Sequence, residues 1–170
     1  MEKTDKNRII RMFDYNVWVL EKVWACVDQL TDEQFCLETG FSQGSIRNQL
    51  VHVISATRRW VDRLRMLPAR PHLEPGAFQA KDTLRKEWGQ FLVEARAYIE
   101  SLNDESMLES IRWGIPSRQL SAETPRREIL LHLANHATDH RAQILAAIDF
   151  FFHKESVEQD LIFFLTETQP

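Results

Sequence analysis

Four long segments of this chain carry apolar residues at alternating spacings of three and four positions, and no other feature constrains the fold as strongly. In the first segment the series is Ile10, Phe13, Val17, Leu20, Trp24 and Val27. This spacing places the apolar side chains on one face of an α-helix. Amphipathic helices are therefore predicted over residues 5–30, 46–66, 84–102 and 125–151.

Proline and glycine residues mark the connections between these segments. Pro68, Pro71, Pro75 and Gly76 follow the second segment and are incompatible with a continuous helix. We therefore expect a long connection there, of the kind that crosses one end of a helical bundle. Residues 108–120 favour extended structure and contain turn formers, which predicts a small hairpin.

Capping residues mark where helices start. Ser45 is predicted to cap the second helix, and Thr124, which precedes a proline, to cap the fourth. Ser156 and Gln159 stand at the spacing of a capping box, which predicts a short helix over residues 161–165.

Length and composition fit one ordinary domain. The chain has 170 residues, of which 44% are hydrophobic, enough for a core that needs no disulfide or metal to fold. The predicted architecture is all-α: a single domain over residues 1–170 that forms an antiparallel four-helix bundle with a short fifth helix near the C-terminus and a small hairpin before the fourth helix.

Charge and cysteine content exclude several classes of protein. The formal net charge is −4 and basic residues are scattered, which argues against nucleic-acid binding. No apolar run approaches the ~20 residues of a membrane span. Cys26 and Cys36 lack the spacing of a metal site or a disulfide framework, and with no leader segment the chain is expected to be cytoplasmic.

Three histidines lie at four-residue spacing in the fourth predicted helix: His132, His136 and His140. Histidines four positions apart share one side of a helix and can converge on one ion. His132 and His140 are separated by about 12 Å along the axis, so only adjacent pairs can do this. His136 and His140 lie nearer the apolar face than His132. His52, on the second helix, lies about 140° from the centre of its own apolar face, so the three rings are expected to meet beside the core. His52, His136 and His140 are therefore predicted to hold one divalent ion in a groove open to solvent.

Three neutral imidazoles leave a Zn²⁺ ion an open position for water or a thiolate, whereas structural zinc usually has four protein ligands. Zn²⁺ and Ni²⁺ are the preferred ions here, with Fe²⁺ and Mn²⁺ as alternatives, because imidazole serves several of these metals. A carboxylate-bridged di-iron bundle is excluded because no histidine has a glutamate three positions before it.

Four segments of the chain form a larger signature. They are residues 44–52 (GSIRNQLVH), 124–128 (TPRRE), 135–144 (NHATDHRAQI) and 160–165 (DLIFFL). Together they resemble the DinB/YfiT-like metalloenzyme family. The resemblance implies a four-helix bundle with a divalent ion on His52, His136 and His140. Many members have a second histidine where Asp139 stands, but that position is not a ligand in the family.

Members of this family include thiol transferases that use low-molecular-weight thiols, and a thiol-dependent isomerase. The resemblance therefore implies a metal-dependent enzyme that acts on a small-molecule substrate, by transfer of a low-molecular-weight thiol to an electrophile or, as second choice, by hydrolysis. The alternative is a non-catalytic metal-binding bundle that acts through protein partners in a stress response. Asp62 and Asp139 are the candidate general bases.

Several other residues receive specific interpretations. His132 is predicted to lie at the boundary of the site, supporting the ligands at most, and Trp60 to wall the pocket beyond His52. His72 and His153 are expected on the surface. Arg141 points toward the core, where a carboxylate such as Glu21 or Asp62 is expected to pair with it.

Aromatic residues near the C-terminus predict a homodimer. The stretches 150–152 and 162–164 hold five phenylalanines and one isoleucine, more apolar surface than a short terminal helix needs to dock.

Overall fold

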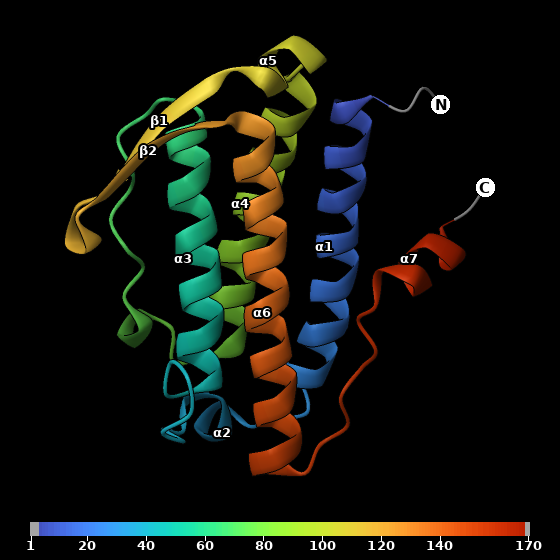
Figure 1. Cartoon of the computed structure of the whole chain (residues 1–170). Helices are drawn as coiled ribbons and strands as arrows, with labels where there is room; N and C mark the ends of the chain where they lie inside the picture. Colours follow the sequence, from blue (N-terminus) through green and yellow to red (C-terminus); the bar gives the residue numbers. More distant parts are fainter. Residues whose placement is uncertain (1–3, 169–170) are drawn as a thin grey trace.

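The computed structural model describes residues 4–168, and these are mostly helical. Four long helices lie side by side (Figure 1). They are α1 (Asp5–Val27), α3 (Ile46–Leu64), α4 (Lys81–Ser101) and α6 (Arg126–Phe152). The apolar spacing of the sequence thus predicted all four, with ends shifted by up to three residues.

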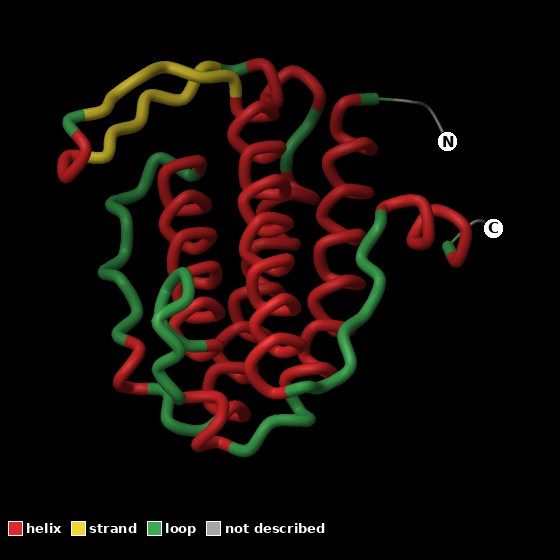
Figure 2. Tube along the Cα trace, turned by 60° about the horizontal axis from the view of Figure 1, so that its bottom comes forward, coloured by secondary structure: helices red, strands yellow, loops and turns green. Residues whose placement is uncertain are grey.

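Short elements connect or flank these helices. They are the helices α2 (Asp32–Cys36), α5 (Asp104–Leu108) and α7 (Leu161–Glu167), the 3-10 turns η1 (Pro75–Ala77) and η2 (Pro116–Arg118), and the strands β1 (Ser110–Ile115) and β2 (Leu120–Pro125). The two strands form an antiparallel sheet, the predicted hairpin, which is seen at one end of the helices in Figure 2. The protein is therefore mostly helical with a small two-stranded sheet, rather than all-α.

The hairpin extends further along the chain than predicted, and this changes the start of α6. Thr124 is not a helix cap, because it pairs with Ile111 in the sheet. Its hydroxyl accepts a hydrogen bond from the Trp113 indole nitrogen at 3.0 Å. Pro125 occupies the N-cap position without a side-chain cap.

Buried apolar side chains from the long helices form one core. Val19, Leu84, Ile144 and Ile148 are fully buried, and Trp24 is 1% exposed. Burial of such residues is the main favourable contribution to folding, at roughly 25 cal/mol per Å² of apolar surface.

Two neighbouring pairs of long helices run in the same direction. Arg127 near the start of α6 pairs with Asp5 at the start of α1, at 2.6 Å. The Tyr98 hydroxyl, near the end of α4, donates to the Leu64 carbonyl at the end of α3, at 2.9 Å. Contacts between α1 and α4 and between α3 and α6 join opposite ends, as Arg85 with Asp28 and Gln49 with Gln143 show. The expected wholly antiparallel arrangement is therefore wrong for two of these four pairs.

The connection between α3 and α4 explains these directions. It was predicted to cross one end of the helices, but it runs back along the side of α3, so that α4 starts again at the end where α3 began (Figures 1 and 2). Arg70 within it is held to Asp62 of α3 by an ion pair of 2.9 Å.

Helix caps are partly as predicted. The Ser45 hydroxyl accepts from the Asn48 amide, as expected. The Ser156–Gln159 capping box is wrong: α7 begins after Asp160 with no side-chain cap. Two short helices were not predicted, α2 and α5.

The apolar residues near the C-terminus differ in exposure. Phe164 of α7 packs against Tyr15 and Trp18 of α1. Phe150 and Phe151, at the end of α6, are exposed, and so are Ile162 and Phe163 of α7. The homodimer stays a prediction.

None of the helices formed by residues 4–168 combines the length and the apolar character that crossing a bilayer requires.

Candidate metal centre

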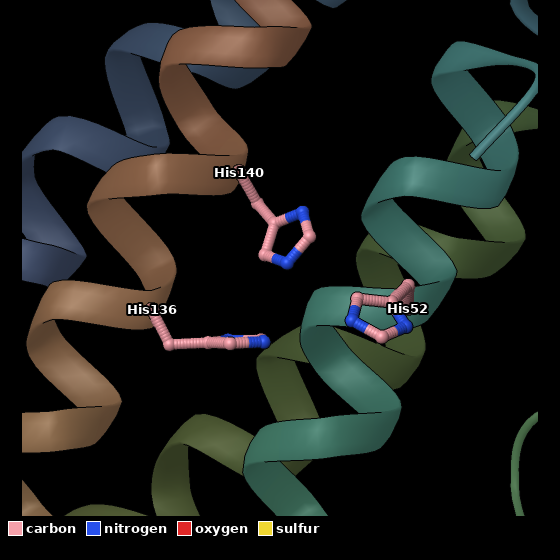
Figure 3. A group of neighbouring side chains, drawn as sticks. All are labelled: His52, His136 and His140. Atoms are coloured by element: carbon pink, nitrogen blue, oxygen red, sulfur yellow. The ribbon is translucent and has the colours of Figure 1, made fainter. Parts of the chain in front are cut away.

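Three histidines from two neighbouring helices meet beside the core. His52 comes from α3, and His136 and His140 come from successive turns of α6 (Figure 3). Their ring centroids are 4.5 Å apart for His136 and His140, 4.7 Å for His52 and His140, and 5.5 Å for His52 and His136. One nitrogen from each ring lies within 4.8 Å of the others. These are the three residues that the sequence predicted.

His132 lies next to this group but outside it. Its ring is 5.8 Å from that of His136 and 5.4 Å from that of Trp60. It therefore extends the row of imidazoles by one turn of α6 without joining the three nitrogens that converge, as expected for a residue at the boundary of the site.

The environment keeps all three rings neutral. Burial, followed by the neighbouring His140, His52 and His132, lowers the pKa of His136 to about 4. Burial also lowers the pKa of His52 and His140. A neutral imidazole is the form that binds a metal ion, so the site is prepared for coordination at neutral pH.

Gln49, a buried residue of α3, fixes the ring of His140. Its amide nitrogen donates to Ser42 Oγ at 2.9 Å and to Gln143 Oε1 at 2.6 Å. Its oxygen therefore faces Nδ1 of His140, at 3.1 Å, and accepts the proton of that nitrogen. The hydrogen-bond network thus leaves Nε2 of His140 with its lone pair available for a ligand.

The donor set fits a divalent ion. Nδ1 of His136 is buried and has no hydrogen-bond partner among the described residues. A buried polar nitrogen without a partner is costly, and coordination would satisfy it. Within residues 4–168, no carboxylate or thiol joins the three imidazoles as a fourth ligand.

The histidines lie at a cavity of about 700 Å³. Its wall comes from α3, from α6, from the hairpin and from the connection after α3. Trp60 lines it, as predicted. A second cavity of about 80 Å³ lies within the apolar core and touches none of the histidines. The larger cavity is therefore the space in which a ligand could reach the three rings.

Comparison with families of known proteins matches residues 1–151 to the DinB family. This match covers α1 to α6 up to its last turn, and so includes all three histidines. The chain belongs to the DinB family. A comparison with curated proteins finds no match.

One expectation about the charged residues of this DinB protein is wrong. Within residues 4–168 neither Glu21 nor Asp62 nor another carboxylate pairs with Arg141; its guanidinium instead donates to Asn16 Oδ1 at 2.5 Å and to Thr138 Oγ1 at 2.9 Å. Asp62 is buried against Arg70 rather than paired with Arg141.

The candidate general bases receive no support from the geometry. Neither Asp62 nor Asp139 is among the residues that line the cavity, and Asp62 is held in its ion pair. The carboxylate that does line it is Glu128, which the sequence did not single out.

His72 is exposed, as predicted, but it also lines the cavity, and its Nδ1 lies 3.3 Å from Ser55 Oγ. Four further cavity residues escaped the sequence reasoning: Arg59, Arg63, Trp113 and Arg118. Arg59 and Arg63 are four positions apart on α3, with the spacing of a solvated helix face, and no local pattern shows that the hairpin approaches them.

Proposed function

We propose that this DinB-type four-helix bundle binds one divalent ion through His52, His136 and His140 and uses it as an enzyme. Zn²⁺ and Ni²⁺ are the preferred ions, and Fe²⁺ and Mn²⁺ are the alternatives. The observation that carries the proposal is the convergence of three neutral imidazoles at the wall of a cavity large enough for a small molecule.

The proposed reaction is transfer of a low-molecular-weight thiol to a small electrophile, with hydrolysis as the second choice. When bound, an ion with three imidazole ligands supplies Lewis acidity that lowers the pKa of a thiol or a water molecule. In the transfer, the thiol sulfur forms a bond to the electrophilic carbon, the leaving group departs with its electron pair, and the thiol proton passes to solvent. The thiolate is the reactive form of such a thiol.

The protein's own residues would position the reactants. Gln49 holds His140 in one tautomer, and the three low-pKa imidazoles stay unprotonated at neutral pH. Trp60 and Trp113 pack edge to face at 5.1 Å and form an apolar wall beside the histidines. This wall offers apolar contact to a substrate of modest size.

The cavity favours this enzyme over a bundle that acts only through protein partners. A structural metal needs no adjacent space, whereas a catalytic ion needs access for its substrate.

The test combines metal analysis with a thiol-conjugation assay. Freshly purified protein should contain about one divalent ion per chain. Conjugation of mercaptosuccinate to 1-chloro-2,4-dinitrobenzene, with release of chloride, should stop after chelation and return when the ion is restored. Equal rates with and without chelator would contradict the transferase. A loaded protein that cleaves esters but ignores thiols would move the assignment to hydrolysis.

A further inference from the structure

Three arginines line the cavity around the histidines. Arg59 and Arg63 lie on α3, one turn apart, and Arg118 lies in η2, at the tip of the hairpin. Segments far apart in the sequence thus bring their guanidinium groups to one space.

These three arginines form no ion pair in the described part of the chain, although the charge of Asp62 acts on Arg63. Among residues 4–168, no carboxylate oxygen lies within 4.0 Å of any of the three guanidinium groups. Arg59 donates to the Arg70 carbonyl. Arg63 stacks on the Trp60 ring, with 5.0 Å between its central carbon and the ring centroid.

The neighbouring arginines behave differently, although they belong to the same stretch of chain. Arg58 pairs with Glu87, and Arg65 pairs with Glu94 at 2.6 Å. Both acids lie on α4. The side of α3 that faces α4 therefore has its charges compensated, whereas the side that faces the cavity does not.

Other charges in the cavity wall leave the excess positive. Glu128 is the one acid among the lining residues, and it is also held by Arg127 at 3.3 Å. Three arginines against one glutamate give these four side chains a net charge of about +2 at neutral pH.

This arrangement is costly without a ligand. Arg59 and Arg63 are both partly buried, and burial together with the charge of Arg59 lowers the pKa of Arg63. Like charges held close together in a partly desolvated place repel each other, and a bound anion relieves that repulsion. Guanidinium groups also bind carboxylate and phosphate oxygens through paired hydrogen bonds.

We propose that the cavity binds a small dianion, whose carboxylate or phosphate groups contact Arg59, Arg63 and Arg118 and whose other end faces the three histidines. The apolar part of such a molecule would lie on Trp60 and Trp113. The dianion's role as thiol or electrophile rests on the proposed function, whereas its binding does not.

The test is calorimetric titration of the metal-loaded protein at low ionic strength with three small thiols of different charge. Mercaptosuccinate carries two carboxylates, thioglycerol is neutral and cysteamine is a cation. Mercaptosuccinate should bind at least about tenfold more tightly than thioglycerol, and cysteamine should bind most weakly. Equal affinity for mercaptosuccinate and thioglycerol would overturn the proposal.

Variants of the three cavity arginines test whether these residues bind the anion. Arg59→Gln, Arg63→Gln and Arg118→Gln should each weaken mercaptosuccinate binding by about tenfold and leave thioglycerol binding unchanged. Arg11→Gln is the matched control, because Arg11 is an exposed arginine of α1 outside the cavity. Arg118 lies in an exposed turn, so its replacement tests the site without disturbing the core. Three variants indistinguishable from Arg11→Gln would also overturn the proposal.

A final experiment tests anion binding independently of the proposed enzymatic reaction. Succinate and inorganic phosphate carry the charge but no sulfur, so they should bind the chelated protein and lose affinity in Arg63→Gln. The tighter of the two identifies the oxyanion that the site prefers. Such binding in a protein without thiol transfer would support the anion site and refute the proposed reaction, whereas transfer without anion binding would do the reverse.

Discussion

Helix α6 presents polar residues on two faces, and the surroundings of these residues differ between the two faces. Toward α3 it presents His136 and His140, beside a wide cavity whose three arginines form no ion pair within residues 4–168. Toward α1 it presents Arg141, which is 1% exposed. On the first face charged groups are left without an ion pair among the described residues, whereas on the second face the buried guanidinium is hydrogen-bonded to its neighbours.

The environment of Arg141 shows how a buried charge is held without an ion pair. Asn16 and Thr138 accept from its guanidinium, Gln159 accepts at 3.4 Å, and the Tyr15 ring lies 5.5 Å from its central carbon. Burial lowers the pKa of Arg141, and Tyr15 opposes that shift. Several neutral acceptors together replace a carboxylate. The contrast indicates that the open face is built for a ligand and the closed face for stability.

Removal of a histidine ligand should have the largest effect. His52→Ala, His136→Ala and His140→Ala should each weaken metal binding by more than about 100-fold, beyond what a supporting residue contributes. Elemental analysis after dialysis measures this. His132→Ala is the control and should retain the ion; a loss as large as in the other three variants would mean that a different pair of α6 histidines binds.

On the opposite face, Arg141→Ala should lower the free energy of unfolding by about 2–3 kcal/mol. The change leaves Asn16 and Gln159 without their donor and opens a space in a buried region. Urea unfolding of the metal-free protein measures it. Arg11→Ala, on the exposed side of α1, should change stability by less than about 0.5 kcal/mol. If the Arg141 variant kept its stability but failed to bind metal, the assignment of one face to ligand binding and the other to stability would be wrong.

Replacing Gln49 should have a smaller effect on the metal site. Gln49→Leu removes the acceptor that fixes the tautomer of His140, so metal affinity should fall by about tenfold. Competition with a chelator of known affinity measures it. Gln143 is hydrogen-bonded to Gln49 but not to His140, so Gln143→Leu should lower metal affinity less than Gln49→Leu does. Equal losses in both variants would indicate general loosening rather than orientation of the ring.

Acid should produce the smallest effect, in the metal-free protein. The pKa of His136 is about 4 in the folded protein, below the ordinary value of 6.5 that applies when the chain is unfolded. Between these values the unfolded chain binds more protons at this residue, so the contribution of His136 to stability falls as the pH drops from about 6.5 to about 4 and changes no further below that. With solvent reaching the half-buried rings, we expect a loss of about 1 kcal/mol. His136→Gln should flatten the profile, and an unchanged slope in that variant would assign the titration to other groups.

The long helices and the three histidines followed from the sequence because both depend on short-range spacing. A stripe of apolar residues and a pair of histidines one turn apart are local features, and the choice of His140 over His132 as the partner of His136 followed from their angles to the apolar face. The five-residue helices α2 and α5 were missed because caps define them rather than an apolar period: Thr31 with Gln34, and Asn103 with Ser106.

Features that depend on contacts between distant segments could not be predicted in this way. The path of the connection beside α3 reverses the expected direction of α4, and no single proline in it encodes that path. Arg141 was assigned a carboxylate because one strong partner is the simplest solution, whereas the protein uses several weak ones. The charge of the cavity depends on where the hairpin brings Arg118, which only the fold determines.

The hairpin therefore has a consequence for how this protein could diversify. The histidines stand on two packed helices, where most changes would damage the core, but one wall of the cavity is a surface turn between β1 and β2. Surface turns accept substitutions and insertions at little cost to stability. A new sequence at residues 116–118 could thus alter which molecules enter while the helices that carry the histidines stay as they are, so that selectivity and metal chemistry can evolve, or be engineered, separately.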